Sequence, residues 1–224
     1  MAQSNNPPTN LTPASPENSS RTSVGIVDYG RGNLTSVRNA IQAIGGNAQV
    51  ISDPAKIDNI SHLILPGVGA FGEAMERLRH SGWVSALHAH AMVRRRPLLG
   101  ICLGMQLLME SGTEHGIHAG LGWIAGTVSK LTSTSDCRVP HIGWNDVELV
   151  TDSPLLVGLN TREDFYFVHS YAVRPTNESS VTGWCQQGER FAATLQQENL
   201  FATQFHPEKS QRAGLRLLEN FLAC

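Results

Sequence analysis

The sequence has almost no excess of charge of either sign. Its 17 Lys and Arg residues balance 19 Asp and Glu residues, which leaves a formal net charge of −2. Proteins that bind nucleic acid or anionic membranes need a dense positive patch, and the one basic run, Arg94-Arg95-Arg96, is typical of a solvated helix end. We therefore expect neither nucleic acid nor a membrane among the partners.

Cysteine is scarce and irregularly placed. The four cysteines, at positions 102, 137, 185 and 224, form no Cys-x-x-Cys pair and have no histidine at metal-ligand spacing. This pattern argues against a disulfide framework and a structural metal site, and it fits a reducing compartment. We predict no metal, and no motif indicates a cofactor.

Long apolar runs are absent as well. No segment approaches the roughly 20 apolar residues that a membrane-spanning helix needs. Residues 1–23 are rich in Asn, Pro, Ser and Thr, and they lack the basic and apolar regions of a signal peptide. We expect them to form a disordered tail, and residues 24–224 to form one domain of a soluble, cytoplasmic protein.

Short apolar runs alternate with helical patterns in the first half of the chain. Strands are expected at 24–28, 48–51, 62–65 and 97–101, and helices at 34–44, 73–79, 83–93 and 103–110. This alternation favours a mostly parallel sheet with helices on both faces. After about residue 120 the pattern changes to successive strands at 122–128, 145–150, 165–173, 181–186, 191–195 and 200–205, before a last helix at 211–222 capped by Ser210.

We predict an α/β fold, a flavodoxin-like three-layer sandwich. Its central sheet is expected to be mostly parallel, with an antiparallel extension in the C-terminal half. The 41% hydrophobic content is sufficient for one sizeable core.

Cys102 lies in the most informative motif. The apolar run that ends in Gly100-Ile101-Cys102-Leu103-Gly104 passes directly into a helical pattern. A Gly-x-nucleophile-x-Gly turn between strand and helix lifts the side chain above the sheet and aims the next N–H at the reacting carbonyl. The alternative is a buried structural cysteine, which is equally common for such a motif on its own.

A base and its orienting partner occur about a hundred residues later. In an extended segment residues i and i+2 share a face, so the His206 imidazole and the Glu208 carboxylate can lie side by side. A thiol needs a base to become a thiolate, and the base needs a partner that fixes its tautomer. Together with Cys102 they predict a Cys-His-Glu triad, although the pair alone could be surface residues.

Two further segments are candidates. The loop Pro66-Gly67-Val68-Gly69 follows a strand, and its glycines leave N–H groups free for an oxyanion, although an ordinary connecting loop would look the same. Gln106 follows Cys102 by one helical turn and could bind a polar group of the substrate or simply face solvent. His141 is expected to pack in a loop, and we leave it outside the catalytic set.

Together, these motifs resemble those of the class I glutamine amidotransferases. The resemblance runs from about residue 24 to the C-terminus, and it is supported by five ordered blocks: Asp28-Tyr29-Gly30 with Gly32-Asn33-Leu34, Leu65 to Gly72, Pro140 to Asn145, Tyr166 to Tyr171 and Gln204 to Gln211. Within the family, the blocks are most similar to subunits that deliver ammonia to a (β/α)8-barrel cyclase subunit.

The resemblance implies roles for individual residues. Cys102 would attack the carboxamide of L-glutamine to form a thioester, His206 would carry the proton, and Glu208 would orient His206. The oxyanion would be held by the N–H of Leu103 and the backbone of Gly67, Val68 and Gly69. Gln106 and the backbone of His169, Ser170 and Tyr171 would bind the glutamine α-groups, and Asn33, Tyr166 and Lys209 would contact the cyclase.

Each assignment has a simpler alternative. Asn33 could cap a helix, Tyr166 could be core packing, and Lys209 could be a solvated charge. Arg31 departs from the family, which usually carries a small or apolar residue there.

At the level of the whole protein, two other hypotheses stay open. One is an amidotransferase of another pathway, such as pyridoxal phosphate, guanylate or anthranilate synthesis, and the other is a non-catalytic redox or binding module.

Overall fold

The computed structural model describes residues 22–135, 137–150 and 153–224. The expected disordered tail falls mainly on residues 1–21, which lie outside the described residues. Ser23, which we assigned to the tail, is instead the first residue of a strand. Within the described residues, no helix is long and apolar enough to cross a membrane.

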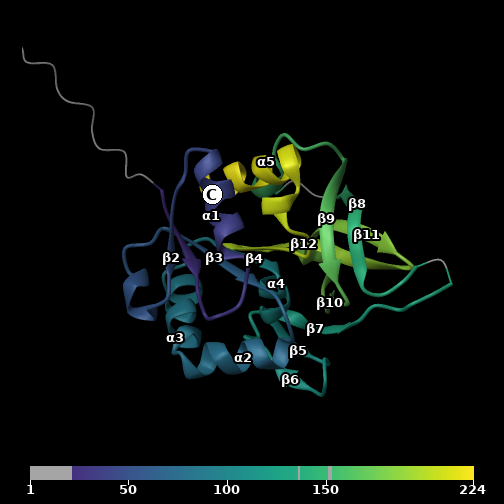
Figure 1. Cartoon of the computed structure of the whole chain (residues 1–224), viewed down its shortest axis with the longest axis horizontal. Helices are drawn as coiled ribbons and strands as arrows, with labels where there is room; N and C mark the ends of the chain where they lie inside the picture. The colour runs from purple at the N-terminus through teal and green to yellow at the C-terminus, as the bar shows by residue number, and fades with distance from the viewer. Residues whose placement is uncertain (1–21, 136, 151–152) are drawn as a thin grey trace, which may run out of the picture.

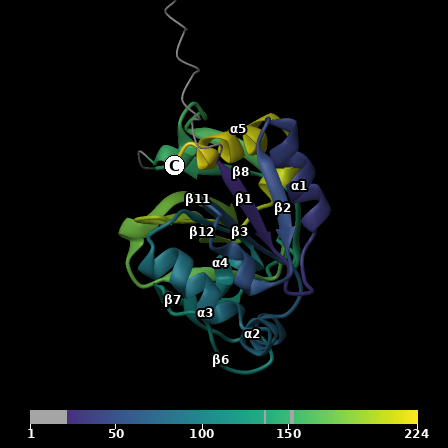
Figure 2. The ribbon, with the colours of Figure 1, turned by 90° about the vertical axis from the view of Figure 1, so that its left-hand side faces the viewer.

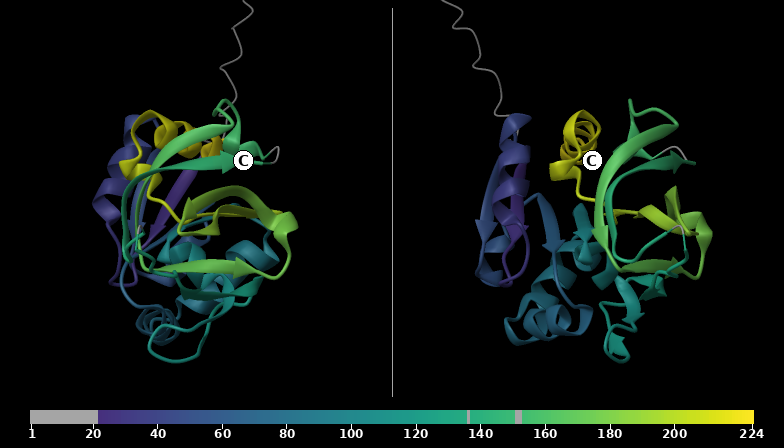
Figure 3. Two further views of the ribbon diagram at one scale, coloured as in Figure 1. Left: turned by 90° about the vertical axis from the view of Figure 1, so that its right-hand side faces the viewer. Right: turned by 45° about the vertical axis from the view of Figure 1, so that its right-hand side comes forward.

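The larger sheet has nine strands in the order β2-β1-β3-β4-β13-β12-β11-β8-β9. Its first five strands pair in parallel: β2 (Asn47–Ile51), β1 (Ser23–Val27), β3 (His62–Gly67), β4 (Leu98–Cys102) and β13 (Leu200–Thr203). The other four continue the sheet in antiparallel pairing: β12 (Glu189–Gln197), β11 (Val181–Gln187), β8 (His141–Leu149) and β9 (Arg162–His169). Figure 3 shows these antiparallel strands, in green, at the opposite end of the molecule from β1 and β2.

Helices cover both faces of the parallel strands, as Figures 1 and 2 show. One face carries α1 (Leu34–Ala43) and α5 (Gln211–Leu222), and the other carries α2 (Phe71–His80) and α3 (Trp83–His88), which continues as a π-helical turn over Ala89–Val93. Side chains alternate between two buried clusters, as strands require: Ile64 of β3 belongs to the α1 and α5 cluster, and Leu63 and Leu65 to the other. The predicted three-layer α/β fold is confirmed.

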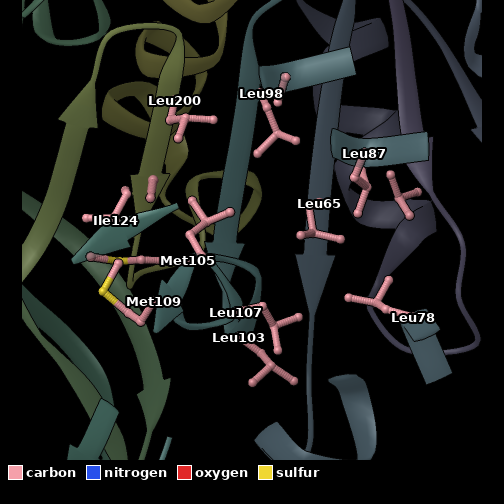
Figure 4. Close-up of a cluster of buried hydrophobic side chains, with 14 of the residues drawn as sticks. Leu65, Leu78, Leu87, Leu98, Leu103, Met105, Leu107, Met109, Ile124 and Leu200 are labelled. Carbon is pink, nitrogen blue, oxygen red and sulfur yellow. The ribbon is translucent and has the colours of Figure 1, made fainter. Parts of the chain in front are cut away.

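A second sheet lies beside the first. It has the order β10-β7-β5-β6, formed by β10 (Tyr171–Pro175), β7 (Ile124–Lys130), β5 (Met109–Gly112) and β6 (His118–Ala119). Figure 4 shows Leu103, Met105 and Leu107 of α4 (Leu103–Leu107) in the buried cluster shared by β3, β4 and β7. Short 3-10 turns complete the structure at Pro54–Ile57, Pro154–Leu156, Glu178–Ser180 and Pro207–Lys209.

The helix predicted over 103–110 is wrong in its second half. Helix α4 ends at Leu107, and Met109 already belongs to strand β5. In a longer helix the carbonyls of residues 107–109 would accept hydrogen bonds from N–H groups four residues later. Here they accept them from the N–H groups of residues 121–124. A distant segment thus ends the helix, and the local sequence carries no sign of it.

Two other predicted elements also differ. The single strand predicted over 165–173 is two strands, β9 and β10, which belong to different sheets and are separated by Ser170. His141 does not lie in a loop but opens strand β8. In the sequence, residues 165–173 are one continuous run of residues that favour β-structure. Such a run does not show where the chain leaves one sheet and enters the next.

The backbones of α4 and β3 approach each other closely, which explains why residue 104, just after the elbow, is a glycine. A Cβ atom on Gly104 would lie 1.8 Å from the carbonyl oxygen of Leu65, so α4 can touch β3 only without a side chain there. We predict that Gly104→Ala lowers the free energy of unfolding by about 2–4 kcal/mol, measured by urea denaturation.

Gly72→Ala in α2 is the matched control for this test. The atoms nearest to its added Cβ belong to the His118 side chain, which can move, and the free energy of unfolding should change by less than about 1 kcal/mol. Equal effects of the two substitutions would show that the contact with Leu65 is not the constraint.

Candidate active site

Cys102 joins strand β4 directly to helix α4 with no intervening loop. It is the last residue of β4, and Leu103 is the first of α4. Its φ of 55° and ψ of −110° fall in a region that non-glycine residues rarely adopt, which is the strained backbone of a nucleophile elbow. The predicted elbow is therefore present in the structure.

The Cys102 sulfur lies among polar groups from two other strands. Its Sγ is 3.9 Å from the carbonyl oxygen of Val168, at the end of β9, and 3.7 Å from the amide Nε2 of Gln204, just after β13. The thiol is almost buried, with 6% of Cys102 exposed. Cys102 also belongs to a buried apolar cluster, but these two polar contacts distinguish its sulfur from that of a purely structural cysteine.

His206 and Glu208 form the close pair that the sequence predicts. The Nδ1 of His206 lies 2.8 Å from Oε1 of Glu208, and both side chains are buried. Two bonds place this segment: the His206 N–H donates to the Tyr166 carbonyl, and the Ser210 hydroxyl donates to the His206 carbonyl. Ser210 precedes α5 as predicted, but its hydroxyl secures His206 and does not cap the helix.

The electrostatics of the imidazole fit a proton carrier. Burial lowers the pKa of His206, but the neighbouring Cys102 sulfur and the Glu208 carboxylate raise it by more, and the net shift is upward to about 10. Because Glu208 occupies Nδ1, the free nitrogen is Nε2, which is buried and has no hydrogen-bond partner among the described residues. An imidazolium beside a thiol favours the thiolate.

A cavity of about 400 Å³ opens onto the thiol. It is lined by the loop after β3, by the elbow and helix α4, and by the chain between β9 and β10; the lining residues are Val68, Gly69, Ala70, Cys102, Leu103, Gln106, Glu114, Pro140, Val168, His169, Ser170 and Tyr171. A larger hollow of about 590 Å³ lies between β9 and α5, but no cysteine or histidine lines it. The smaller cavity is therefore the candidate site.

The structure brings most of the predicted oxyanion group to this cavity. Gly67 pairs with Cys102 across β3 and β4, so the loop leaves β3 beside the elbow, and Val68 and Gly69 line the cavity. Gly69 has a φ of +99°, which a glycine adopts without strain. Gly67 itself does not line the cavity. Leu103 opens α4, where an N–H has no partner within the helix.

The predicted glutamine-binding residues lie together in the lining of the cavity. The Nε2 of Gln106 donates to the carbonyl of Tyr171 at 2.9 Å, so this side chain is buried and does not face solvent. The same carbonyl accepts a hydrogen bond from Nδ1 of His169, also at 2.9 Å. Ser170 lies between them and lines the cavity.

Two of the predicted interface residues, Tyr166 and Lys209, lie next to each other. Tyr166 is half-buried on β9, and the ammonium of the exposed Lys209 lies 5.6 Å from the centre of its ring. Asn33 is exposed and caps α1, because its Oδ1 accepts from the Ser36 N–H. The atypical Arg31 forms an ion pair with Glu73, at the start of α2.

Three residues near the thiol were missed from the sequence. Gln204 touches the sulfur, Glu114 places a carboxylate on the cavity wall, and His141 hydrogen-bonds to His169 with 2.9 Å between their nitrogens. A glutamine in a strand and a glutamate in a loop have no characteristic spacing. The only signal was membership of a block: His141 lies in the block from Pro140 to Asn145 and Gln204 in the block from Gln204 to Gln211, whereas Glu114 lies in none.

The two histidines are held in defined neutral forms. The Tyr171 carbonyl can only accept, so His169 carries its proton on Nδ1, and its Nε2 accepts from Nδ1 of His141. The Nε2 of His141 then accepts from the Asn145 amide at 3.2 Å. Burial lowers the pKa of His141 to about 4 and that of His169 to about 3.

This pair makes a prediction about stability and pH. Both histidines stay neutral when folded but take up protons in the unfolded chain below about pH 6.5, so the folded state loses stability as the pH falls below that value. We predict that the free energy of unfolding of His141→Asn falls less between about pH 7 and pH 5 than that of the parent protein, by urea denaturation at each pH. The control is His115→Asn, on an exposed loop, in which the free energy of unfolding should change with pH as it does in the parent protein. The same pH dependence in His141→Asn as in the parent would contradict a neutral, buried His141.

Comparisons with known proteins agree with this geometry. Residues 25–224 match the family model of class I glutamine amidotransferases. The chain is 46% identical over 198 residues to the imidazole glycerol phosphate synthase subunit HisH 1 of Campylobacter jejuni, covering 88% of this chain and 98% of that protein. It is also 46% identical over 201 residues to subunit HisH of Chlorobium luteolum, covering 89% and 98%.

Solved structures support the fold. A glutamine amidotransferase crystal structure aligns with a TM-score of 0.70 at 19% identity over 90% of this chain and 99% of that one. PurLQS from Thermotoga maritima aligns with a TM-score of 0.71 at 18% identity over 91% and 98%. With the family model matched over nearly all the described residues, the chain belongs to the class I glutamine amidotransferases.

Proposed function

We propose that the chain is the glutaminase subunit of an imidazole glycerol phosphate synthase. It hydrolyses L-glutamine to glutamate and ammonia in the cytoplasm and passes the ammonia to a cyclase subunit. The complex makes imidazole glycerol phosphate and aminoimidazole carboxamide ribonucleotide for histidine biosynthesis. The observation that carries the proposal is the elbow cysteine beside a buried His206–Glu208 pair, in a chain that is 41–46% identical to HisH subunits over 88% of its length.

The first half-reaction uses the elbow and the imidazole. The Cys102 thiol gives its proton to Nε2 of His206, and the sulfur attacks the carboxamide carbon of glutamine. The carbonyl oxygen becomes an oxyanion, for which the N–H groups of Leu103, Val68 and Gly69, all residues that line the cavity, are the proposed donors. The C–N bond then breaks, ammonia leaves with the proton from His206, and a γ-glutamyl thioester remains.

The second half-reaction restores the thiol. A water molecule gives a proton to His206 and attacks the thioester carbon, and the C–S bond breaks to release glutamate. The Glu208 carboxylate holds Nδ1 of His206 throughout, so the ring keeps Nε2 toward the sulfur and its positive charge is stabilised.

The cavity offers partners for the α-groups of glutamine. Glu114 is the only charged residue that lines it within the described part of the chain, and its carboxylate suits the α-ammonium group. The Glu114 Oε2 also accepts from the Phe71 N–H, which fixes the carboxylate at the start of α2. Gln106 and the backbone of residues 169–171 form the rest of this wall.

The cyclase, a (β/α)8 barrel, is proposed to dock over the cavity mouth. Exposed apolar side chains gather there, and we name them the mouth patch: Val68, Ile142, Trp144 and Val168, with Tyr166 and Lys209. Register pairs Ile142 with Val168 and Trp144 with Tyr166, so these residues are neighbours on two adjacent strands. The Val168 carbonyl touches the thiol, so a partner on this patch would lie next to the site of ammonia release. Asn33 remains a predicted contact.

Two other functions compete with this proposal. An amidotransferase of another pathway has the same triad, but the relatives reported above are HisH subunits. A redox module would need a reactive thiol but no acyl-transfer relay, which the His206–Glu208 pair provides. The glutamine analogue 6-diazo-5-oxo-norleucine should therefore label Cys102, as peptide mass spectrometry would show.

The triad predicts the effect of three substitutions. Cys102→Ser and His206→Asn should each lower glutaminase kcat by roughly 10³-fold or more, and Glu208→Gln by roughly 10²-fold, with the cyclase and its nucleotide substrate present. Glutamate formation is the measurement. Cys185→Ala, a buried cysteine outside the cavity, is the control and should keep the parent rate. Full activity of Cys102→Ser would disprove the proposal.

The mouth patch predicts how a substitution within it changes the affinity for the cyclase. Trp144→Ala should weaken binding to the cyclase by about tenfold or more, because truncating an exposed aromatic residue at an interface commonly costs that much. Titration calorimetry of the two purified subunits measures it. Ile117→Ala removes an even more exposed apolar side chain, which does not line the cavity, and this variant should bind as the parent does. Equal affinities of the two variants would place the cyclase elsewhere.

A further inference from the structure

Gln204 is a buried amide beside the thiol that the triad chemistry does not use. It is fully buried, it follows strand β13, and it precedes His206 by two residues. Its Nε2 lies 3.7 Å from the Cys102 Sγ, and its backbone N–H donates to the Ala193 carbonyl at 2.8 Å. The backbone bond holds the residue in register, so the contact with sulfur does not depend on a mobile segment.

The neighbouring groups determine which end of the amide faces the sulfur. The Tyr171 carbonyl can only accept, so the Gln106 atom bonded to it is Nε2. The same Nε2 is 3.1 Å from one end of the Gln204 amide, which must therefore be the acceptor, Oε1. The other end, an NH₂ group, is left to face the sulfur.

An N–H group directed at sulfur acts on the charged form of the nucleophile. A thiolate accepts a hydrogen bond much more strongly than a thiol, because charge on the acceptor strengthens the bond. The neutral imidazole of His206 takes the thiol proton, and the resulting imidazolium stabilises the thiolate from another direction. The amide itself neither gains nor loses a proton.

We propose that Gln204 is a catalytic residue, which donates a hydrogen bond from its amide to the Cys102 thiolate. This inference rests on the proposed function for its meaning in catalysis, but the contact can be tested on the thiol alone. The donor is itself held by Gln106 and the Tyr171 carbonyl, both on the wall where glutamine is proposed to bind. The nucleophile and the substrate wall thus share one hydrogen-bonded chain.

The test is alkylation of Cys102 by iodoacetamide in the full chain, followed by peptide mass spectrometry that separates it from the other three cysteines. The thiolate displaces iodide, so the rate at a given pH reports how much thiolate is present. In Gln204→Met the rate at about pH 7 should fall roughly tenfold, and the difference should vanish at alkaline pH where every thiol is ionised.

A second variant guards against a folding defect. Gln204→Glu keeps the shape of the side chain and the oxygen that accepts from Gln106. It replaces the donating NH₂ group with the second oxygen of a carboxylate. Alkylation at about pH 7 should be slower still, because a second negative charge beside the sulfur disfavours the thiolate. Thr203→Val is the matched control: it removes a buried polar group from the adjacent residue, whose hydroxyl bonds to the Phe205 carbonyl, and should alkylate as the parent does.

The outcomes separate the two proposals. Parent rates of alkylation in Gln204→Met and Gln204→Glu would overturn the role of Gln204 and leave the glutaminase proposal standing. If Cys102→Ser kept glutaminase activity, the proposed function would fail, whatever the alkylation rates. Slower alkylation in both Gln204 variants together with lower kcat for glutamine, and little change in KM, would support the donor.

Discussion

The site depends on the parallel pairing of β13 with β4. Thr203 pairs with Ile101, so the residues that follow β13 are brought beside the elbow that follows β4. Cys102 and His206 are about a hundred residues apart in the sequence, and this register is what makes them neighbours. The carboxyl ends of adjacent parallel strands are the usual place for a binding site in an α/β sheet.

The rest of the site is arranged around that edge of the sheet. Strand β3 pairs on the other side of β4 and delivers the loop with Val68 and Gly69, while β9 supplies the Val168 carbonyl and ends in His169. Strained backbone at Cys102 and the close approach of Gly104 to Leu65 set the height and direction of the thiol. A chain of amide, carbonyl and imidazole groups then fixes Gln106, His169 and Tyr171 in the cavity wall, where Glu114 supplies the one carboxylate among the described lining residues.

Much of this could be predicted from local sequence. The elbow, the His206–Glu208 spacing and the alternation of strands and helices each have a short-range physical cause, and the structure shows all three. The end of α4 could not be predicted, because the carbonyls of residues 107–109 accept hydrogen bonds from the N–H groups of residues 121–124, which lie more than ten residues further along the chain. Gln204 and Glu114 were missed because their importance comes from position in the fold, and neither type of residue has a sequence pattern that marks such a position.

The proposed reaction depends above all on the acylation of Cys102 by glutamine. The most direct measurement is the mass of the Cys102 peptide after the complex, with its cyclase and nucleotide substrate, is mixed with glutamine and quenched in acid within the first turnovers. We expect an added γ-glutamyl group on Cys102 that disappears as glutamine is exhausted. Glutamate formation without any acyl group on Cys102, or with one on another residue, would contradict it.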